Sequence, residues 1–276
     1  MSTTDQQPSS LVPPEAVART YTNRVYEDPW EAVCDYREVV QWAAENPSEG
    51  ATGISNRFDL PRGRVEAWLG DSRPNSVRGI QVAEDRGWIA PLPSSERFRG
   101  LNALLAWVLQ SGSITTETWV PFFTVGSDRD RQLLSAAANM AGLTLDVTRS
   151  ASALRSQEMR PIEDGSVLGR VLVVLGAPRG AVREEGQLTL PSYLDRVPER
   201  YAQEFVQLYI HNLGQNRDDR FIIHLRPSHS VDYLQSVAAL VKRLTDDPVR
   251  VIENNIILSK PATREVAVWD PLLGIE

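Results

Sequence analysis

The sequence predicts an α+β protein in which a small helical domain precedes a larger domain built from two similar halves. Short amphipathic helices follow one another from about residue 28 to residue 87. Proline and serine then interrupt the chain at Ile89–Ser95, as in a linker, and the remainder repeats one order of helices and strands. The expected parts are a disordered tail over 1–25, a helical domain over 26–90, and a second domain over 97–270 whose halves span about 97–180 and 190–265.

Composition limits the class of protein. The chain has 276 residues, of which 42% are hydrophobic, enough for a sizeable core and roughly two domains. It contains no apolar run long enough to span a membrane, and Met1–Pro14 lacks the charged and apolar regions of a signal peptide. Cys34 is the only cysteine, which excludes an internal disulfide and a cysteine-based zinc site. We therefore expect a cytoplasmic protein that does not associate with membranes.

Arginine supplies nearly all of the positive charge in an acidic chain. The formal net charge is −7, and of the 29 basic residues only Lys242 and Lys260 are lysines. Lysine depletion with an acidic balance is typical of salt-adapted, haloarchaeal proteomes, and a GC-rich bacterial genome is the alternative. The net charge opposes nucleic-acid binding by the surface as a whole, but local patches decide such binding.

The helical domain is expected to open at Asp28, which can cap a helix that begins with Pro29. Apolar residues at spacings of three and four continue this helix to about Asn46, giving it one apolar face. Asp59 and Leu60 make a tight break further along, and Gly87 is a typical helix end. Three further helices are expected over about 52–58, 61–69 and 77–86.

Two short helices joined by a tight turn are the helix-turn-helix pattern of DNA-binding domains. The recognition helix is then 61–69, with Val65, Trp68 and Leu69 on its buried side and two arginines in its first turn, where base edges and phosphates would lie. Five arginines against three acids make residues 57–78 locally positive, although a helical bundle with solvated arginines would look similar. The expected DNA contacts in this domain are Arg57, Arg62, Arg64, Arg73 and Arg78.

The second domain repeats a pattern in which a long apolar helix leads each half. Each leading helix is followed by a glycine-containing turn, an apolar strand and a helix with a polar start. In the first half the expected elements are helices over 99–110, 128–140 and 167–175 and strands over 119–125 and 143–148. In the second they are helices over 199–212 and 231–244 and strands over 221–226, 249–252 and 255–259.

Over about residues 97–265 this pattern resembles the LAGLIDADG homing endonuclease family. Leu104–Ile114 (LLAWVLQSGSI) is similar to the first signature motif of that family, and Phe205–Gly214 (FVQLYIHNLG) is similar to the other. Between them, Leu168–Gly180 and then Leu190–Pro191 are similar to the segment that precedes the second motif in the family. The resemblance implies two αββαββα units that meet through their leading helices and form a pseudo-symmetric saddle over DNA.

The resemblance also implies that catalysis has been lost. In the family an acid just before the last glycine of each motif holds the metal ions that activate water, whereas this chain has Ser111 and Leu213 there. A serine hydroxyl is a poor ligand for Mg²⁺, and leucine is no ligand at all. Glu117, Asp218 and Asp219 lie near the motifs, but acids in turns of an acidic chain are normally solvated. We therefore expect no catalytic residue, no metal and no cofactor.

These observations together predict a sequence-specific protein that binds double-stranded DNA, with transcriptional regulation as its role. Some bacterial regulators similarly join a degenerate LAGLIDADG domain to a helix-turn-helix, in the opposite order. The alternatives are an active metal-dependent homing-type endonuclease and a protein-interaction module, and homodimerisation through the helical domain is left open. Further DNA contacts expected in the saddle are Thr116, Thr118, Arg149 and Arg226.

Overall fold

The protein is a mixed α+β protein, as the sequence predicts. Its structure is a computed structural model that describes residues 10–148, 157–181, 188–211, 214–217, 220–224 and 230–268. The chain divides into two compact units, an N-terminal unit of residues 1–90 and a C-terminal unit of residues 91–276. This division falls inside the segment 89–95 that separates the two predicted domains.

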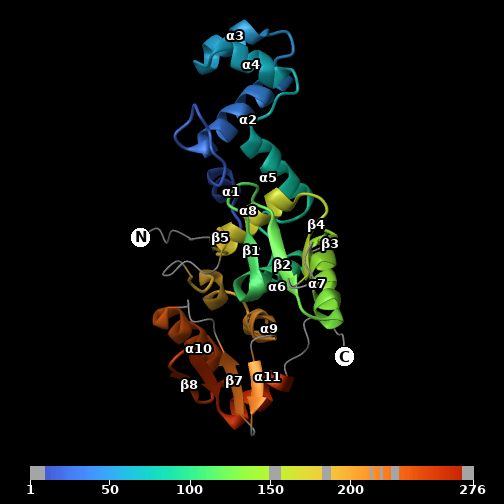
Figure 1. Ribbon diagram of the computed structural model, residues 1–276. Coiled ribbons are helices and arrows are strands. Elements are labelled where there is room, and N and C mark those ends of the chain that lie inside the picture. Colours follow the sequence, from blue (N-terminus) through green and yellow to red (C-terminus); the bar gives the residue numbers. More distant parts are fainter. Residues whose placement is uncertain are drawn as a thin grey trace, which may run out of the picture. The chain divides into compact units, whose positions relative to one another are not determined.

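The N-terminal unit is helical throughout its described part (Figure 1). Asp28 accepts a hydrogen bond from the Trp30 amide at 3.0 Å, and Pro29 is the first residue of the longest helix, so this helix begins with the expected cap. The last helix is followed by Gly87 in the left-handed region at φ 72°. The helices are α1 (Pro14–Arg19), α2 (Pro29–Glu45), α3 (Ala51–Phe58), α4 (Arg62–Leu69) and α5 (Asn75–Asp85).

Helix α1 corrects the expectation of a disordered tail over residues 1–25. Residues 1–9 lie outside the described part of the chain, but α1 is ordered, and its Val17 and Ala18 are fully buried. The Tyr21 side chain passes so close to α5 that a β-carbon at Gly79 would lie 1.8 Å from the Tyr21 hydroxyl. Polar and proline-rich composition concealed a short segment whose few apolar residues are buried by tertiary packing.

The C-terminal unit begins with a helix, two strands, a helix, two strands and a helix. Its strands form an antiparallel sheet in the order β3-β4-β2-β1-β5. Phe123 and Met159 face each other across neighbouring strands and are buried. The elements are α6 (Glu96–Ser111), β1 (Gly112–Ile114), β2 (Pro121–Val125), α7 (Asp128–Ala141), β3 (Leu145–Thr148), β4 (Gln157–Pro161), α8 (Gly165–Leu175) and the short β5 (Gly180–Ala181).

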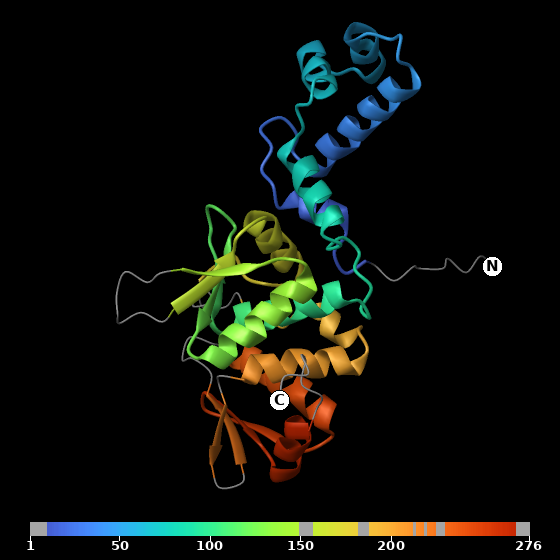
Figure 2. The same cartoon turned by 90° about the vertical axis from the view of Figure 1, so that its right-hand side faces the viewer.

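The same order of elements then occurs a second time, after the 3-10 helix η1 (Ser192–Asp195). Here the strands form a second antiparallel sheet, in the order β6-β7-β9-β8. Figure 2 shows the two sheets as separate groups of strands, one green to yellow and one orange to red. The elements are α9 (Glu199–Ile210), β6 (Gly214–Arg217), β7 (Arg220–His224), α10 (Val231–Thr245), β8 (Val249–Ile252), β9 (Asn255–Leu258) and α11 (Lys260–Val268).

The two passes agree in sheet topology as well as in element order. The order β1-β2-β4-β3 in the first sheet corresponds to β6-β7-β9-β8 in the second, strand for strand. In each pass the strand after the leading helix starts on a glycine, Gly112 in β1 and Gly214 in β6. A β-carbon at Gly112 would lie 2.7 Å from the Phe122 carbonyl oxygen, so glycine allows this close approach of β1 and β2.

The leading helices α6 and α9 contact each other through paired polar groups in an otherwise apolar interface. Arg99 on α6 forms an ion pair with Glu204 on α9 at 2.7 Å, and the Asn102 side-chain amide donates to the Tyr201 carbonyl at 3.0 Å. Phe98 packs edge-on against Tyr201 with the ring centroids 5.8 Å apart. Within the described part of the chain, no helix is long and apolar enough to cross a membrane.

Candidate nucleic-acid interface

Helices α2, α3 and α4 share one small hydrophobic core. Val39 from α2, Ile54 from α3 and Val65 from α4 are fully buried, and Trp68 from α4 is 8% exposed. Tyr36 meets the Trp68 ring edge-on, with the centroids 5.7 Å apart. Figure 1 shows α3 and α4 next to each other at one end of α2. All three helices are thus held in place by the same contacts, and α4 has one face left for solvent.

The turn between α3 and α4 is three residues long and internally bonded. Asp59 adopts the left-handed conformation at φ 52° and ψ 40°, which aspartate tolerates better than most residues. The Leu60 amide donates to the Ser55 carbonyl at 3.1 Å, and the Ser55 hydroxyl donates to the Leu60 carbonyl at 2.6 Å. Pro61 then precedes the first residue of α4. These bonds fix the angle at which α4 leaves α3.

The exposed face of α4 carries one ion pair among small residues. Arg62 and Glu66 lie one turn apart, and the Arg62 Nε donates to Glu66 Oε1 at 2.8 Å, with the two side chains 64% and 50% exposed. Gly63, Ala67 and Gly70 share this exposed face. A β-carbon at Gly63 would have no atom within 4 Å. The floor of a nucleic-acid groove could therefore approach the backbone of α4 closely.

The structure corrects two details of this helix. Leu69, expected on the buried side with Val65 and Trp68, is 40% exposed, and α4 ends there. Arg64, expected to project beside Arg62, is instead half-buried: it donates to the Tyr26 hydroxyl at 2.8 Å and lies over the Tyr26 and Trp68 rings. The periodicity of one helix does not reveal that Tyr26 packs against it.

Arg64 belongs to a small polar network inside the N-terminal unit. The Tyr26 hydroxyl, which accepts from Arg64, donates to Asp35 Oδ2 at 2.6 Å. Burial of the Tyr26 ring, helped by the bond to Asp35, raises the pKa of Tyr26 to about 12. The hydroxyl therefore stays protonated at neutral pH and bridges the guanidinium and the carboxylate. Arg64 thus stabilises the packing of α4 through Tyr26 and Asp35.

The other three arginines of the predicted interface differ in their contacts. Arg57 is exposed at the end of α3, with its guanidinium carbon 3.5 Å from the Trp42 ring centroid. Arg73 is exposed and donates to Gln81 Oε1 at 2.5 Å. Arg78 is exposed on α5. Arg57 and Arg62 are therefore the two predicted contacts that lie exposed on the α3–α4 pair itself.

Two of the four DNA contacts predicted in the C-terminal unit lie within the described residues. Thr116 and Thr118 are exposed in the loop between β1 and β2. Arg179 donates through Nε to the Thr116 carbonyl at 3.0 Å and stacks over Trp119 at 4.3 Å from the ring centroid. Arg149 and Arg226, the other two predicted contacts, lie outside the described residues.

The outward face of the first sheet carries more negative than positive charge. Phe123 and Met159 mark the buried side, so the residues that alternate with them point outward. These include exposed Glu158 and Arg160 on β4, and Asp146 on β3, which pairs directly with Arg160. On the described strands, two carboxylates against one guanidinium give this face a charge that repels phosphate.

Ser111 stands at the end of α6, next to a buried amide without hydrogen bonds. Gln110 is 2% exposed, and within the described residues neither its Oε1 nor its Nε2 has a hydrogen-bond partner; the buried Ser111 Oγ also has none there. Among the described residues, no group of three or more histidine, cysteine, aspartate or glutamate side chains is placed to hold a metal ion. Leu213, Asp218 and Asp219 lie outside the described residues.

Replacing Gln110 by leucine is expected to stabilise the C-terminal unit. A buried amide without partners costs about 1–3 kcal/mol, and leucine has a similar volume without polar atoms. We therefore expect the Gln110→Leu variant to need more denaturant for unfolding, by the equivalent of about 1 kcal/mol or more. Gln110→Glu is the matched opposite change, because it buries a charge at the same place and should destabilise. A lower midpoint for Gln110→Leu in urea unfolding would contradict the expectation.

A partly buried histidine–aspartate pair joins the two passes and was not found by sequence reasoning. The His211 Nε2, just after α9, lies 3.2 Å from Asp130 Oδ1 near the start of α7. Asp130 is 2% exposed and also accepts from the amides of Gly126 and Ser127 at 2.7 and 3.1 Å. The pair is separated by 81 residues along the chain, so no local motif could have revealed it.

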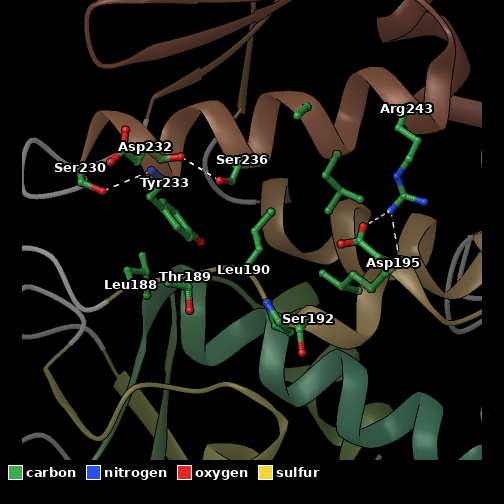
Figure 3. A pocket seen from close by; sticks show the side chains of 14 residues that line it. Leu188, Thr189, Leu190, Ser192, Asp195, Ser230, Asp232, Tyr233, Ser236 and Arg243 are labelled. Atoms are coloured by element: carbon green, nitrogen blue, oxygen red, sulfur yellow. Dashed lines mark hydrogen bonds and ion pairs between the residues drawn. The ribbon is translucent and has the colours of Figure 1, made fainter. Parts of the chain in front are cut away.

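A cavity of about 690 Å³ lies between α10 and the segment that leads into η1 (Figure 3). Leu188, Leu190 and Leu240 contribute to its apolar lining. Arg243 at its edge donates to the Leu194 carbonyl and to Asp195, at 3.2 and 3.1 Å. Arg243 thus links α10 to η1 at the edge of this cavity.

No protein-family model matches the chain, and no curated protein has a significantly similar sequence. The function is therefore inferred from the residues and the geometry of the site.

Proposed function

We propose that this protein is a sequence-specific DNA-binding protein, with transcriptional regulation as its role, and that α3, the turn and α4 act as its helix-turn-helix. One observation carries the proposal: α4 is anchored from behind by the core it shares with α2 and α3, while its exposed face carries Arg62 and Glu66 among small residues. A recognition helix needs this combination, because its base-reading side chains must be positioned by a rigid scaffold.

The dimensions of α4 support entry into the major groove. An α-helix with its side chains is about 10–12 Å across, and the major groove is about 12 Å wide. Gly63, Ala67 and Gly70 reduce the width of α4 on its exposed face. Arg57, exposed at the end of the neighbouring helix α3, is suited to a phosphate contact that fixes the register of the complex.

We further propose that the C-terminal unit is a pseudo-symmetric, LAGLIDADG-like fold without nuclease activity. Support comes from the two αββαββα passes, their matching strand orders and the direct contact of the leading helices α6 and α9. Gly112 and Gly214 start equivalent strands, which supports the alignment of Ser111 and Leu213 with the acids of the family. We therefore propose no metal-dependent step, because neither Ser111 nor Leu213 supplies a carboxylate.

The charge on the outward face of the first sheet favours the N-terminal unit as the main DNA contact. Among the described residues of that face, Asp146 and Glu158 oppose phosphate binding and Arg160 favours it. Thr116 and Thr118 remain proposals for supplementary contacts from the β1–β2 loop. The proposal therefore depends on α3 and α4 more than on a saddle over DNA.

The test compares wild type with two variants. Gly63→Leu should keep α4 out of a DNA groove, and Arg37→Ala removes a positive charge outside the α3–α4 pair. Gly63→Leu adds bulk to the exposed face of α4 at a position with open space, so folding should be preserved while close approach to DNA is blocked. Wild type is expected to retain a subset of genomic fragments in a gel-shift experiment over a series of salt concentrations up to molar salt. Gly63→Leu should weaken retention at least tenfold, or about 1.4 kcal/mol.

Arg37→Ala is the control, because Arg37 is an exposed, ion-paired arginine on α2 outside the α3–α4 pair. It removes one positive charge of the N-terminal unit without changing the exposed face of α4, and retention should change little. Failure of wild type to retain any fragment at any salt concentration would overturn the proposal. Retention that is equal in wild type and Gly63→Leu would exclude α4 as the recognition helix, and Mg²⁺-dependent nicking of plasmid DNA would favour the endonuclease.

A further inference from the structure

The Arg62–Glu66 pair has a geometry that leaves one defined edge of the guanidinium open. Glu66 Oε1 takes the hydrogen bond from Arg62 Nε at 2.8 Å. Within the described part of the chain, the two terminal nitrogens of Arg62 have no partner, and the side chain is 64% exposed. The guanidinium therefore presents two parallel N–H donors, held in place by the carboxylate behind it.

This edge matches one base more closely than any other. Guanine displays two acceptors, O6 and N7, side by side in the major groove, and a planar two-donor fork binds both at once. Adenine offers only one acceptor there beside a donor, and a pyrimidine offers at most one acceptor. The chemistry of Arg62 thus favours a G·C base pair, with Arg62 on the guanine.

We propose that Arg62 reads a guanine in the DNA site and that Glu66 is its positioning residue. This inference rests on the proposed function, since it names the base pair that the α4 face recognises. An exposed ion pair one turn apart contributes little to helix stability. Its contribution here is to restrict the guanidinium to one orientation before DNA arrives, which lowers the entropy lost on binding.

Neither of the other predicted contacts on this pair of helices has the same freedom. Arg64 is half-buried, bonded to the Tyr26 hydroxyl and placed over the Tyr26 and Trp68 rings. Arg57 lies over the Trp42 ring with its guanidinium carbon 3.5 Å from the centroid. Arg62 alone among these three extends from the exposed face of α4, next to the open space at Gly63. Guanine recognition is therefore assigned to Arg62.

The experiment selects bound sequences from a random duplex library with the full chain. Wild type is expected to enrich guanine at one position of its site, and Arg62→Ala should lose that preference while keeping the preferences at other positions. A good bidentate contact discriminates by about 1–3 kcal/mol, which is about 5- to 150-fold. Arg62→Lys should recover little of the preference, because an ammonium is not a planar fork.

Two further measurements distinguish recognition of the guanine base by Arg62 from simple attraction between charges. Replacing the selected guanine by 7-deazaguanine removes N7, so wild type should bind the altered duplex at least about fivefold more weakly, whereas Arg62→Ala should bind both duplexes equally. Glu66→Gln should keep guanine as the preferred base but reduce the discrimination, since the neutral amide holds the guanidinium less firmly. Circular dichroism would verify that each variant remains folded.

The outcomes distinguish this inference from the proposed function. If wild type enriches no sequence, the proposed function itself fails. If wild type enriches a sequence and Arg62→Ala enriches the same one, the proposed function stands and Arg62 is not the reader. A loss of affinity in Arg62→Ala that is equal for all duplexes would assign Arg62 to a phosphate and overturn the guanine assignment.

Discussion

Replacing Trp68 by alanine is expected to destabilise the three-helix core of the N-terminal unit by about 3–5 kcal/mol. Trp68 is 8% exposed and packs edge-on against Tyr36, while Arg64 lies over its ring. Alanine would leave a cavity that α2, α3 and α4 cannot all close. The loss would be measured as faster amide hydrogen exchange in these three helices, together with loss of DNA retention.

Leu69→Ala is the matched control for this prediction. Leu69 follows Trp68 directly, but it is 40% exposed and carries little of the core. We expect its removal to change the unfolding free energy by at most about 0.5 kcal/mol, as for ordinary surface positions. If Trp68→Ala and Leu69→Ala lowered the unfolding free energy by similar amounts, the result would contradict the burial pattern of α4.

Gly100→Ala is expected to destabilise the C-terminal unit by about 1–3 kcal/mol or more. A β-carbon at Gly100 would lie 2.3 Å from the Ala141 nitrogen and 2.6 Å from the Ala137 carbonyl oxygen. Both are backbone atoms of α7, so no side-chain rotation can relieve the contact, and α6 would have to move away from α7. Denaturant unfolding followed by circular dichroism would measure the change.

Gly63→Ala is instead expected to stabilise the protein. Gly63 also lies in a helix, but a β-carbon there meets no atom within 4 Å. Alanine at an exposed helical glycine is generally favourable by about 0.5–1 kcal/mol. Equal destabilisation by Gly63→Ala and Gly100→Ala would mean that backbone propensity, and not the contact of α6 with α7, determines the effect.

Much of the secondary structure could be predicted because its signals are local. Asp28 and Pro29 predicted the start of α2, and apolar spacing predicted α6, α7, α9 and α10 close to their observed ends. The mixed α+β class followed from the same patterns. These elements are long enough for periodicity to be visible in the sequence.

The strands that were missed are those whose signal is not local. Strand β4 has the sequence QEMRP, in which only Met159 and Pro161 are buried. It is a strand because it pairs with β2 on one side and β3 on the other. Strand β1 has three residues, which is too short for an alternating pattern. Each also pairs with a strand far along the chain, β1 with β5 and β4 with β2, which the local sequence does not show.

The candidate site was predicted in type but not in detail. Sequence reasoning placed Arg62 and Arg64 together on α4, because it could count their positions but could not see Tyr26. That tyrosine is 38 residues away along the chain and binds Arg64. The same limit applies to the ion pair of Arg99 with Glu204, 105 residues apart. Contacts between distant segments decide which arginine is presented and which is part of the packing.

The two sheets of the C-terminal unit have the same strand order but chemically different outward faces. The first carries Asp146, Glu158 and Arg160, whereas on the second Ile252 is 51% exposed and lies on the same side as Arg250. A symmetric homodimer must present identical surfaces twice. Because both halves here belong to one polypeptide, each surface can change without its counterpart, and the molecule is free to recognise a partner that has no symmetry of its own.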